Sequence, residues 1–111
     1  MKIAVIGSRK IKVDIGRYIP QGITLLISGG AAGVDQLAER WAREHGVPVQ
    51  SIRPDSIRYG RAAPLVRNRE IVKQAEMVVA LWDGASKGTK YTIDYAKKQG
   101  VRTQVYLLSI P

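Results

Sequence analysis

The sequence contains no cysteine, no phenylalanine and a single histidine among its 111 residues. Without cysteine the chain cannot form disulfides, thiolate metal sites or a cysteine nucleophile. The one histidine, His45, follows a helical pattern at a chain reversal, where we assign it no metal or catalytic role. No apolar run approaches the roughly 20 residues that a membrane-spanning helix needs. We therefore expect no metal, no resident cofactor, no membrane contact and a cytoplasmic location.

Acidic residues are also scarce. Nine Asp and Glu stand against 18 Lys and Arg, which gives a net charge of +9. Such a balance favours anionic partners: nucleotides, other phosphates or nucleic acid. Hydrophobic residues make up 45% of the chain, enough for a packed core. Its length predicts a single domain over residues 1–111.

Five short apolar runs bounded by turn residues predict strands that are buried on both faces. They cover residues 2–6, 24–27, 47–52, 77–81 and 103–108. Helical spacing of apolar residues between these runs predicts four helices. The residues that carry this spacing are Ile11, Ile15, Tyr18 and Ile19; Val34, Leu37, Ala38, Trp41 and Ala42; Leu65, Val72 and Ala75; and Thr92, Ile93 and Ala96. The alternation predicts an α/β fold, a Rossmann-like three-layer domain whose five-stranded parallel sheet has helices on both faces.

Small polar loops follow three of the predicted strands. In such sheets a ligand binds beyond the carboxyl ends of the strands, where the strand order reverses. Two of the loops are rich in glycine and lead into helices, whose free N–H groups and positive dipole end attract anions. The alternative is that the glycines only form tight turns. We predict a phosphate-binding edge made of Gly7, Ser8, Arg9, Ser28, Gly29, Gly30, Asp83, Gly84, Ser86, Gly88 and Thr89.

Four further side chains are candidates for the same pocket. Arg67 and Asn68 lie near the start of the third helix, and Asn68 interrupts its apolar seam. Either these side chains bind the phosphate, ribose or base edges of a ligand, or Asn68 hydrogen-bonds a loop carbonyl and the arginine is solvated. Trp82 ends the fourth strand, where it would stack on a base. Asp35 in a first helical turn either caps the helix or accepts ribose hydroxyls.

Neither glycine-rich loop is a standard nucleotide fingerprint. Residues 29–33 do not read G-x-G-x-x-G, and residues 86–89 are not the end of a P-loop. These departures argue against an ordinary NAD dehydrogenase or ATPase.

Four motifs in this order resemble the SLOG superfamily, and within it the small YspA-related, DUF2493-type proteins. They are VIGSR at residues 5–9, SGGAAGVDQLAERWA at 28–42, RNREIV at 67–72 and ALWDGASKGT at 80–89. The resemblance implies a Rossmann-like fold that binds nucleotides or nucleotide-derived ligands at this edge. Relatives include the Lonely Guy phosphoribohydrolases, to whose helix arginine Arg67 is similar, and DNA-processing protein A. The phosphoribohydrolase motif P-G-G-x-G-T-x-x-E matches Gly88 and Thr89, but Thr92 stands at its glutamate.

Three functions stay open from the sequence. The first is a sensor or binding module for a nucleotide or nucleotide-derived molecule. The second is a nucleotide N-glycosidic hydrolase, for which Asp35, Glu70 and Asp83 are the carboxylates near the loops. The third is a nucleic-acid binder, although the chain lacks the interleaved aromatics of a single-strand platform. We also expect a homodimer, because so small a chain has a modest core.

Overall fold

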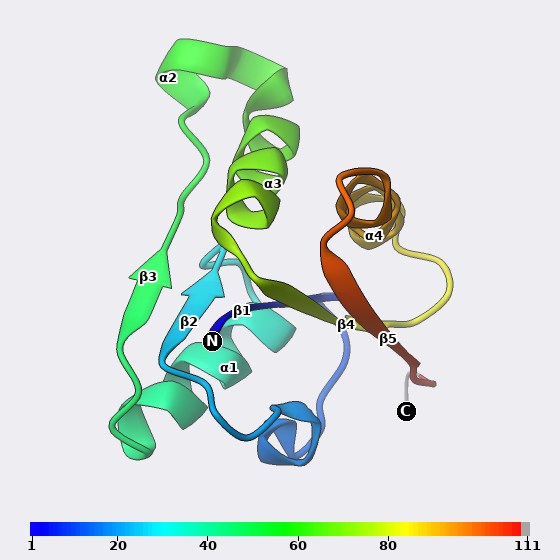
Figure 1. Cartoon of the computed structure of the whole chain (residues 1–111). Helices are drawn as coiled ribbons and strands as arrows, with labels where there is room; N and C mark the ends of the chain where they lie inside the picture. Colours follow the sequence, from blue (N-terminus) through cyan, green and yellow to red (C-terminus); the bar gives the residue numbers. More distant parts are fainter. Residues whose placement is uncertain (110–111) are drawn as a thin grey trace.

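The computed structural model describes residues 1–109, which form one parallel sheet with helices on both faces (Figure 1). The elements in chain order are β1 (Lys2–Gly7), η1 (Ile15–Tyr18), β2 (Leu25–Ser28), α1 (Val34–Glu44), β3 (Val49–Ser51), α2 (Ser56–Tyr59), η2 (Gly60–Ala62), α3 (Ala63–Gln74), β4 (Met77–Trp82), α4 (Lys87–Lys98) and β5 (Arg102–Leu107). The predicted fold class is confirmed. Each predicted strand is present, with its ends shifted by up to two residues.

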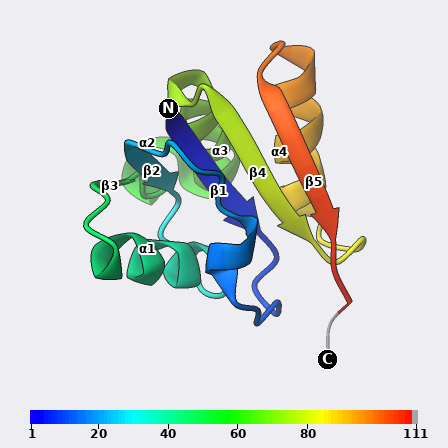
Figure 2. The same cartoon turned by 60° about the horizontal axis from the view of Figure 1, so that its bottom comes forward.

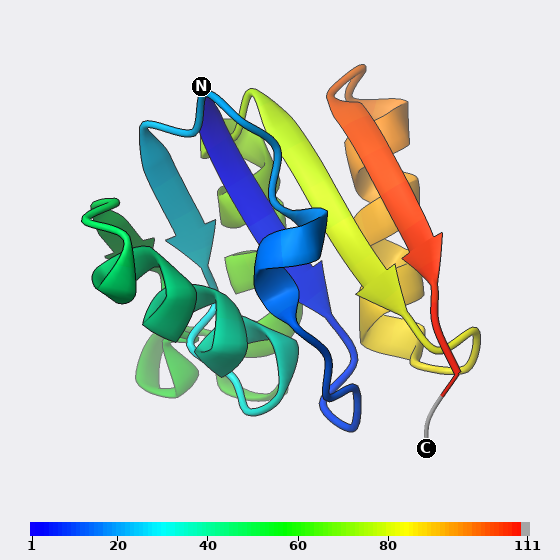
Figure 3. The same cartoon turned by 90° about the horizontal axis from the view of Figure 1, so that it is seen from below.

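The strand order is β3-β2-β1-β4-β5, and every pairing is parallel. Figures 2 and 3 show the five strands running the same way, with η1 and α1 on one face and α3 and α4 on the other. From β1 the chain builds outward to β2 and β3 on one side, then returns to add β4 and β5 on the other. The order therefore reverses between β1 and β4, and a crevice is expected beyond their carboxyl ends.

Two apolar cores hold the three layers together. One packs α1 and η1 on the sheet, and its fully buried side chains include Ile3, Leu26 and Val79. The other packs α3 and α4 on the opposite face around Ile27, Ile71 and Val78. Adjacent residues of the central strands point to opposite faces, so both cores draw on the same continuous apolar runs.

The first predicted helix is wrong. Only one 3₁₀ turn, η1, forms between β1 and β2. Ile11, Val13 and Ile15 alternate with polar residues, which is the period of extended chain rather than of a helix. Gly16 lowers the helix propensity further, and a Cβ at Gly16 would lie 2.7 Å from Nε1 of Trp41. The connection therefore covers the sheet as an extended segment with a single turn.

The buried side of the third helix also differs from the predicted one. Leu65 is exposed, whereas Ala63, Ile71 and Val72 are buried. Pro64 stands in the first turn, as its place in the sequence predicts. The helix is preceded by α2 and η2, which break at Gly60 with a positive φ of 56°.

Candidate functional site

The carboxyl ends of β1 and β4 are joined by one serine. The Ser8 N–H donates to the Leu81 carbonyl at 3.1 Å, and the Asp83 N–H donates to Ser8 Oγ at 3.2 Å. Ser8 is itself buried. These two bonds hold the first and third polar loops side by side at the point where the strand order reverses.

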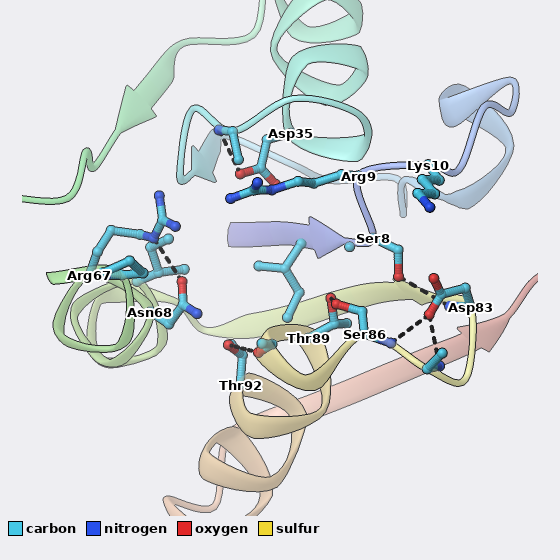
Figure 4. Close-up of a pocket in the computed structure, with 17 residues that line it drawn as sticks. Ser8, Arg9, Lys10, Asp35, Arg67, Asn68, Asp83, Ser86, Thr89 and Thr92 are labelled. Carbon is cyan, nitrogen blue, oxygen red and sulfur yellow. Dashed lines mark hydrogen bonds between the residues drawn. The ribbon is translucent and has the colours of Figure 1, made fainter. Parts of the chain in front are cut away.

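A pocket of about 480 Å³ opens at this point (Figure 4). Ten of the fifteen predicted site residues line it: Gly7, Ser8, Arg9, Asp35, Arg67, Asn68, Asp83, Ser86, Gly88 and Thr89. Seven further residues complete the lining: Ile6, Lys10, Ala31, Pro64, Ile71, Ala85 and Thr92. Five predicted residues lie outside it: Ser28, Gly29, Gly30, Trp82 and Gly84.

Some of the additional lining residues carry a signal in the sequence. Pro64, Arg67, Asn68 and Ile71 are spaced i, i+3, i+4 and i+7, so one face of α3 forms a wall of the pocket. Thr92 lies one turn after Thr89 on α4, where its Oγ1 donates to the Gly88 carbonyl at 2.9 Å. Lys10 simply extends the first loop by one residue. Pro64, Ile71 and Thr92 could therefore have been predicted from the sequence, because they lie three or four residues from predicted site residues on the same helix.

The loop before α4 is shaped by Asp83. Its Oδ1 accepts the N–H groups of Ala85 and Ser86, both at 2.8 Å. These bonds, that of Ser86 first, lower the pKa of Asp83 below its usual value. Ser86 Oγ and Thr89 Oγ1 lie 3.1 Å apart at the helix start. The N–H groups of residues 87–89 have no carbonyl partner within the helix, because they belong to its first turn.

Trp82 supports this loop from outside the pocket. Its indole Nε1 donates to the Ser86 carbonyl at 3.0 Å, and its ring packs against the α3–α4 core. Trp82 thus lies outside the pocket lining, and its ring is partly buried against that core.

Gly29 and Gly30, in the glycine-rich loop after β2, do not line this pocket. The Gly30 N–H donates to Ser28 Oγ at 3.2 Å, and the Ala31 N–H donates to Asp35 Oδ2 at 3.1 Å. Arginine side chains occupy the space over the two glycines. A Cβ at Gly29 would lie 2.7 Å from Nη1 of Arg67, and a Cβ at Gly30 would lie 2.7 Å from Nη1 of Arg53. Guanidinium groups therefore approach the backbone at both glycines, and Gly30 also has a positive φ of 70°.

Ser28 points away from the pocket into a buried polar cluster. Its Oγ donates to Glu39 Oε2 at 2.7 Å, and Ser51 Oγ donates to the same oxygen at 3.4 Å. The other Glu39 oxygen accepts from Arg43 at 3.1 Å. This cluster ties β2 and β3 to α1 and so fixes the helix that carries Asp35.

Arg67 is held in place by two acceptors. Its Nε donates to Asn68 Oδ1 at 2.8 Å, and its Nη1 donates to the Gly29 carbonyl at 2.6 Å. Burial lowers the pKa of Arg67; the Asp35 carboxylate opposes this shift, and the charge of Arg9 adds to it. Arg9 reaches from the first loop toward Asp35 (Figure 4). Two guanidinium groups from different elements thus face one cavity.

Asp35 is buried, with only 7% of its surface exposed. Burial raises the pKa of Asp35 to about 6, although the Ala31 N–H and the charge of Arg67 oppose the shift. Within residues 1–109 its carboxylate forms no ion pair closer than 4.0 Å. An acceptor that can carry a proton near neutral pH therefore faces the cavity beside two cations.

Comparison with known proteins identifies the family. The model of the YspA, cpYpsA-related SLOG family matches residues 14–59. The gene 61 protein of Mycobacterium phage D29 is 35% identical over 88 residues, which cover 74% of this chain and 70% of that protein. The chain belongs to the YspA, cpYpsA-related SLOG family. The resemblance read from its motifs is thereby confirmed, and membership suggests a nucleotide-related binding or processing role. No solved structure matches this SLOG protein significantly.

Two other features of this SLOG protein concern metals and membranes. Among residues 1–109, no group of three or more histidine, aspartate or glutamate side chains is placed to hold a metal ion. In the same residues no helix combines the length and apolar character needed to cross a membrane.

Proposed function

We propose that the chain binds a nucleotide or nucleotide-derived small molecule in the pocket between β1 and β4, as a sensor or binding module. One observation carries the proposal: Arg9 and Arg67 converge on a cavity that also opens onto the first turn of α4. Two guanidinium groups close enough to perturb each other favour an anion between them. The helix start adds unpaired N–H groups and a positive dipole end.

The size and chemistry of the pocket fit a mononucleotide. Its volume of about 480 Å³ lies within the range of about 300–1,000 Å³ typical of small-molecule sites. A phosphate would contact the N–H groups of Gly88 and Thr89 together with the hydroxyls of Ser86 and Thr89. Arg9 and Arg67 would supply the countercharge.

The ligand's sugar would lie toward α1 and α3. Asp35 offers a carboxylate oxygen to ribose hydroxyls. Asn68 uses its Oδ1 for Arg67, and within residues 1–109 its amide N–H groups have no partner, so they can donate to a ligand acceptor. Ile6 and Ile71 form an apolar floor beneath them. Asp35 and Asn68 stand beside Arg67, so the sugar would lie next to the countercharge, and the phosphate would reach from there to the first turn of α4.

Binding can be measured by isothermal titration calorimetry with a panel of nucleoside monophosphates, nucleotide sugars and dinucleotides. Arg67→Ala should weaken the best ligand about 10- to 100-fold, since a charge-assisted hydrogen bond contributes about 1.5–3 kcal/mol. Arg102→Ala removes an exposed arginine at the opposite edge of the sheet and should leave the affinity unchanged. Absence of binding across the panel, or equal losses in both variants, would contradict the proposal.

A second candidate, nucleotide N-glycosidic hydrolysis, is favoured by Asp35. A buried carboxyl group with a pKa of about 6 is suited to proton transfer near neutral pH. Thr92 replaces the glutamate of the phosphoribohydrolase motif, so Asp35 would have to stabilise the positive charge that develops on the sugar. Release of free base from nucleoside monophosphates, lost in Asp35→Asn while binding persists, would support this function. Binding without turnover would reject it.

A further inference from the structure

A short arm projects from the sheet beyond the carboxyl end of β3. The arm comprises residues 53–62, which include α2 and η2, and every residue in it is exposed. Figure 1 shows it arching over the start of α3, away from the sheet. None of its apolar or aromatic side chains contributes to either core. The arm therefore presents its side chains outward.

The side chains of the arm combine positive charge with an aromatic ring. The Arg58 guanidinium lies over the Tyr59 ring, 5.3 Å from its centroid. Arg61 lies two residues after Tyr59, in η2. Neither Arg58 nor Arg61 forms an ion pair within residues 1–109. The arm's one acidic residue, Asp55, accepts the Arg58 N–H at 3.1 Å and caps α2.

We propose that this arm is a binding surface for single-stranded nucleic acid, separate from the pocket. Arg58 and Arg61 would contact phosphates, and the Tyr59 ring beside Arg58 would offer an aromatic face to an unpaired base. Ile57, which is fully exposed, would cover the edge of that base.

The distribution of charge argues for a polyanion over a second copy of the chain. Asp35 and Glu39 are buried, and Glu44 and Asp94 form ion pairs with neighbouring cations. Asp55 and Asp83 are occupied as backbone caps. The surface of another copy thus has few free carboxylates for the arm, while its net charge of +9 repels it.

The surface also suits nucleic acid better than a membrane. Ile57 and Tyr59 are the exposed large apolar side chains of the arm, and two such groups give little area for burial in lipid. The Arg58 guanidinium over the Tyr59 ring instead combines a cation with an aromatic face, as in sites that stack unpaired bases.

The experiment measures fluorescence anisotropy with a labelled oligothymidine of roughly 16 nucleotides, titrated at several salt concentrations between about 50 and 200 mM. The double variant Arg58→Ala/Arg61→Ala should bind at least about tenfold more weakly at low salt. Its slope of log affinity against log salt should fall by about 1.4, which is two phosphate contacts at about 0.7 each for a single strand. Tyr59→Leu should weaken binding about 5- to 100-fold without changing that slope, because a base stack is lost but no charge.

Lys97→Ala/Lys98→Ala is the matched control. It removes the same charge from exposed positions at the last turn of α4, at the other edge of the sheet. Its affinity should stay within about twofold of the unaltered protein, because screening limits the effect of distant charges. The arm variants should keep the unaltered nucleotide affinity and thermal midpoint, since their side chains lie outside the pocket and the cores.

Four outcomes would overturn the proposal. They are no oligonucleotide binding by the unaltered protein, equal losses in the arm and control variants, cosedimentation with anionic vesicles in place of oligonucleotide binding, and self-association that the arm variant abolishes.

Discussion

Replacing Asp35 by asparagine should stabilise the folded protein at neutral pH. Burial is the main cause of the raised pKa, so the charged form is the one that the fold disfavours. A rise in the Asp35 pKa from 3.8 to about 6 corresponds to about 3 kcal/mol of stability lost on ionisation, at about 1.4 kcal/mol for each pKa unit. The helix dipole stabilises a carboxylate in the first turn of α1 by about 0.3–1 kcal/mol, which offsets part of this loss. The net gain expected for Asp35→Asn is about 2 kcal/mol.

The gain should depend on pH. The folded state binds the Asp35 proton more tightly than the unfolded chain, so the penalty is absent below about pH 4 and grows as the pH rises to about 6. Thermal unfolding of both proteins should therefore coincide at about pH 4. Above about pH 6.5 the variant should unfold about 8 °C higher, at roughly 4 °C per kcal/mol for a domain of this size.

Asp83→Asn supplies a control of opposite sign. The pKa of Asp83 is lowered by the N–H groups of Ser86 and Ala85, so its charged form contributes stability that is present above its unfolded pKa and lost as the pH falls. This variant should be less stable at neutral pH, and the difference should shrink in acid. An Asp35→Asn variant that is destabilised at neutral pH, or shifted equally at every pH, would refute the reasoning. The carboxylate would then serve the fold through its bond to the Ala31 N–H.

Two further substitutions test the loops. Gly33→Ala should destabilise the fold by about 2 kcal/mol or more, because Gly33 has a φ of 79° and an added Cβ would meet the Arg9 carbonyl. Urea unfolding measures this loss. Gly22→Ala is the milder control, because Gly22 has a similar φ of 84° but an added Cβ there would meet no other atom. Trp82→Phe should lower the free energy of unfolding by about 1 kcal/mol, because the indole hydrogen bond to the Ser86 carbonyl is lost. It should also speed amide hydrogen exchange at the start of α4. Unchanged exchange there would show that the indole does not order the loop.

A buried carboxylate that destabilises the protein is expected where function requires it. The Asp35→Asn experiment therefore also bears on the pocket. A stabilised variant that loses ligand affinity would show that Asp35 is retained for binding.

The strands and three of the helices could be predicted because they depend on local patterns. Runs such as residues 77–81 are short, apolar throughout and bounded by turn residues, which is typical of a strand buried on both faces. Helical spacing in residues 34–42 leaves a single face for the core. The segment before η1, residues 11–14, was missed because the apolar positions of residues 11–19 fit a helix as well, and only packing against Trp41 and the sheet distinguishes the two.

The sequence by itself determined the α/β fold, the family and the sheet edge at which polar loops gather. Those properties follow from the order of apolar runs and from loop composition, both of which are local. The tertiary structure alone decided which way each side chain points: Ser28 toward Glu39, Trp82 into a core, and Asp35 into the pocket. These orientations, and the pKa of Asp35 that follows from its burial, depend on residues distant in the chain, because burial and electric field come from packing between elements.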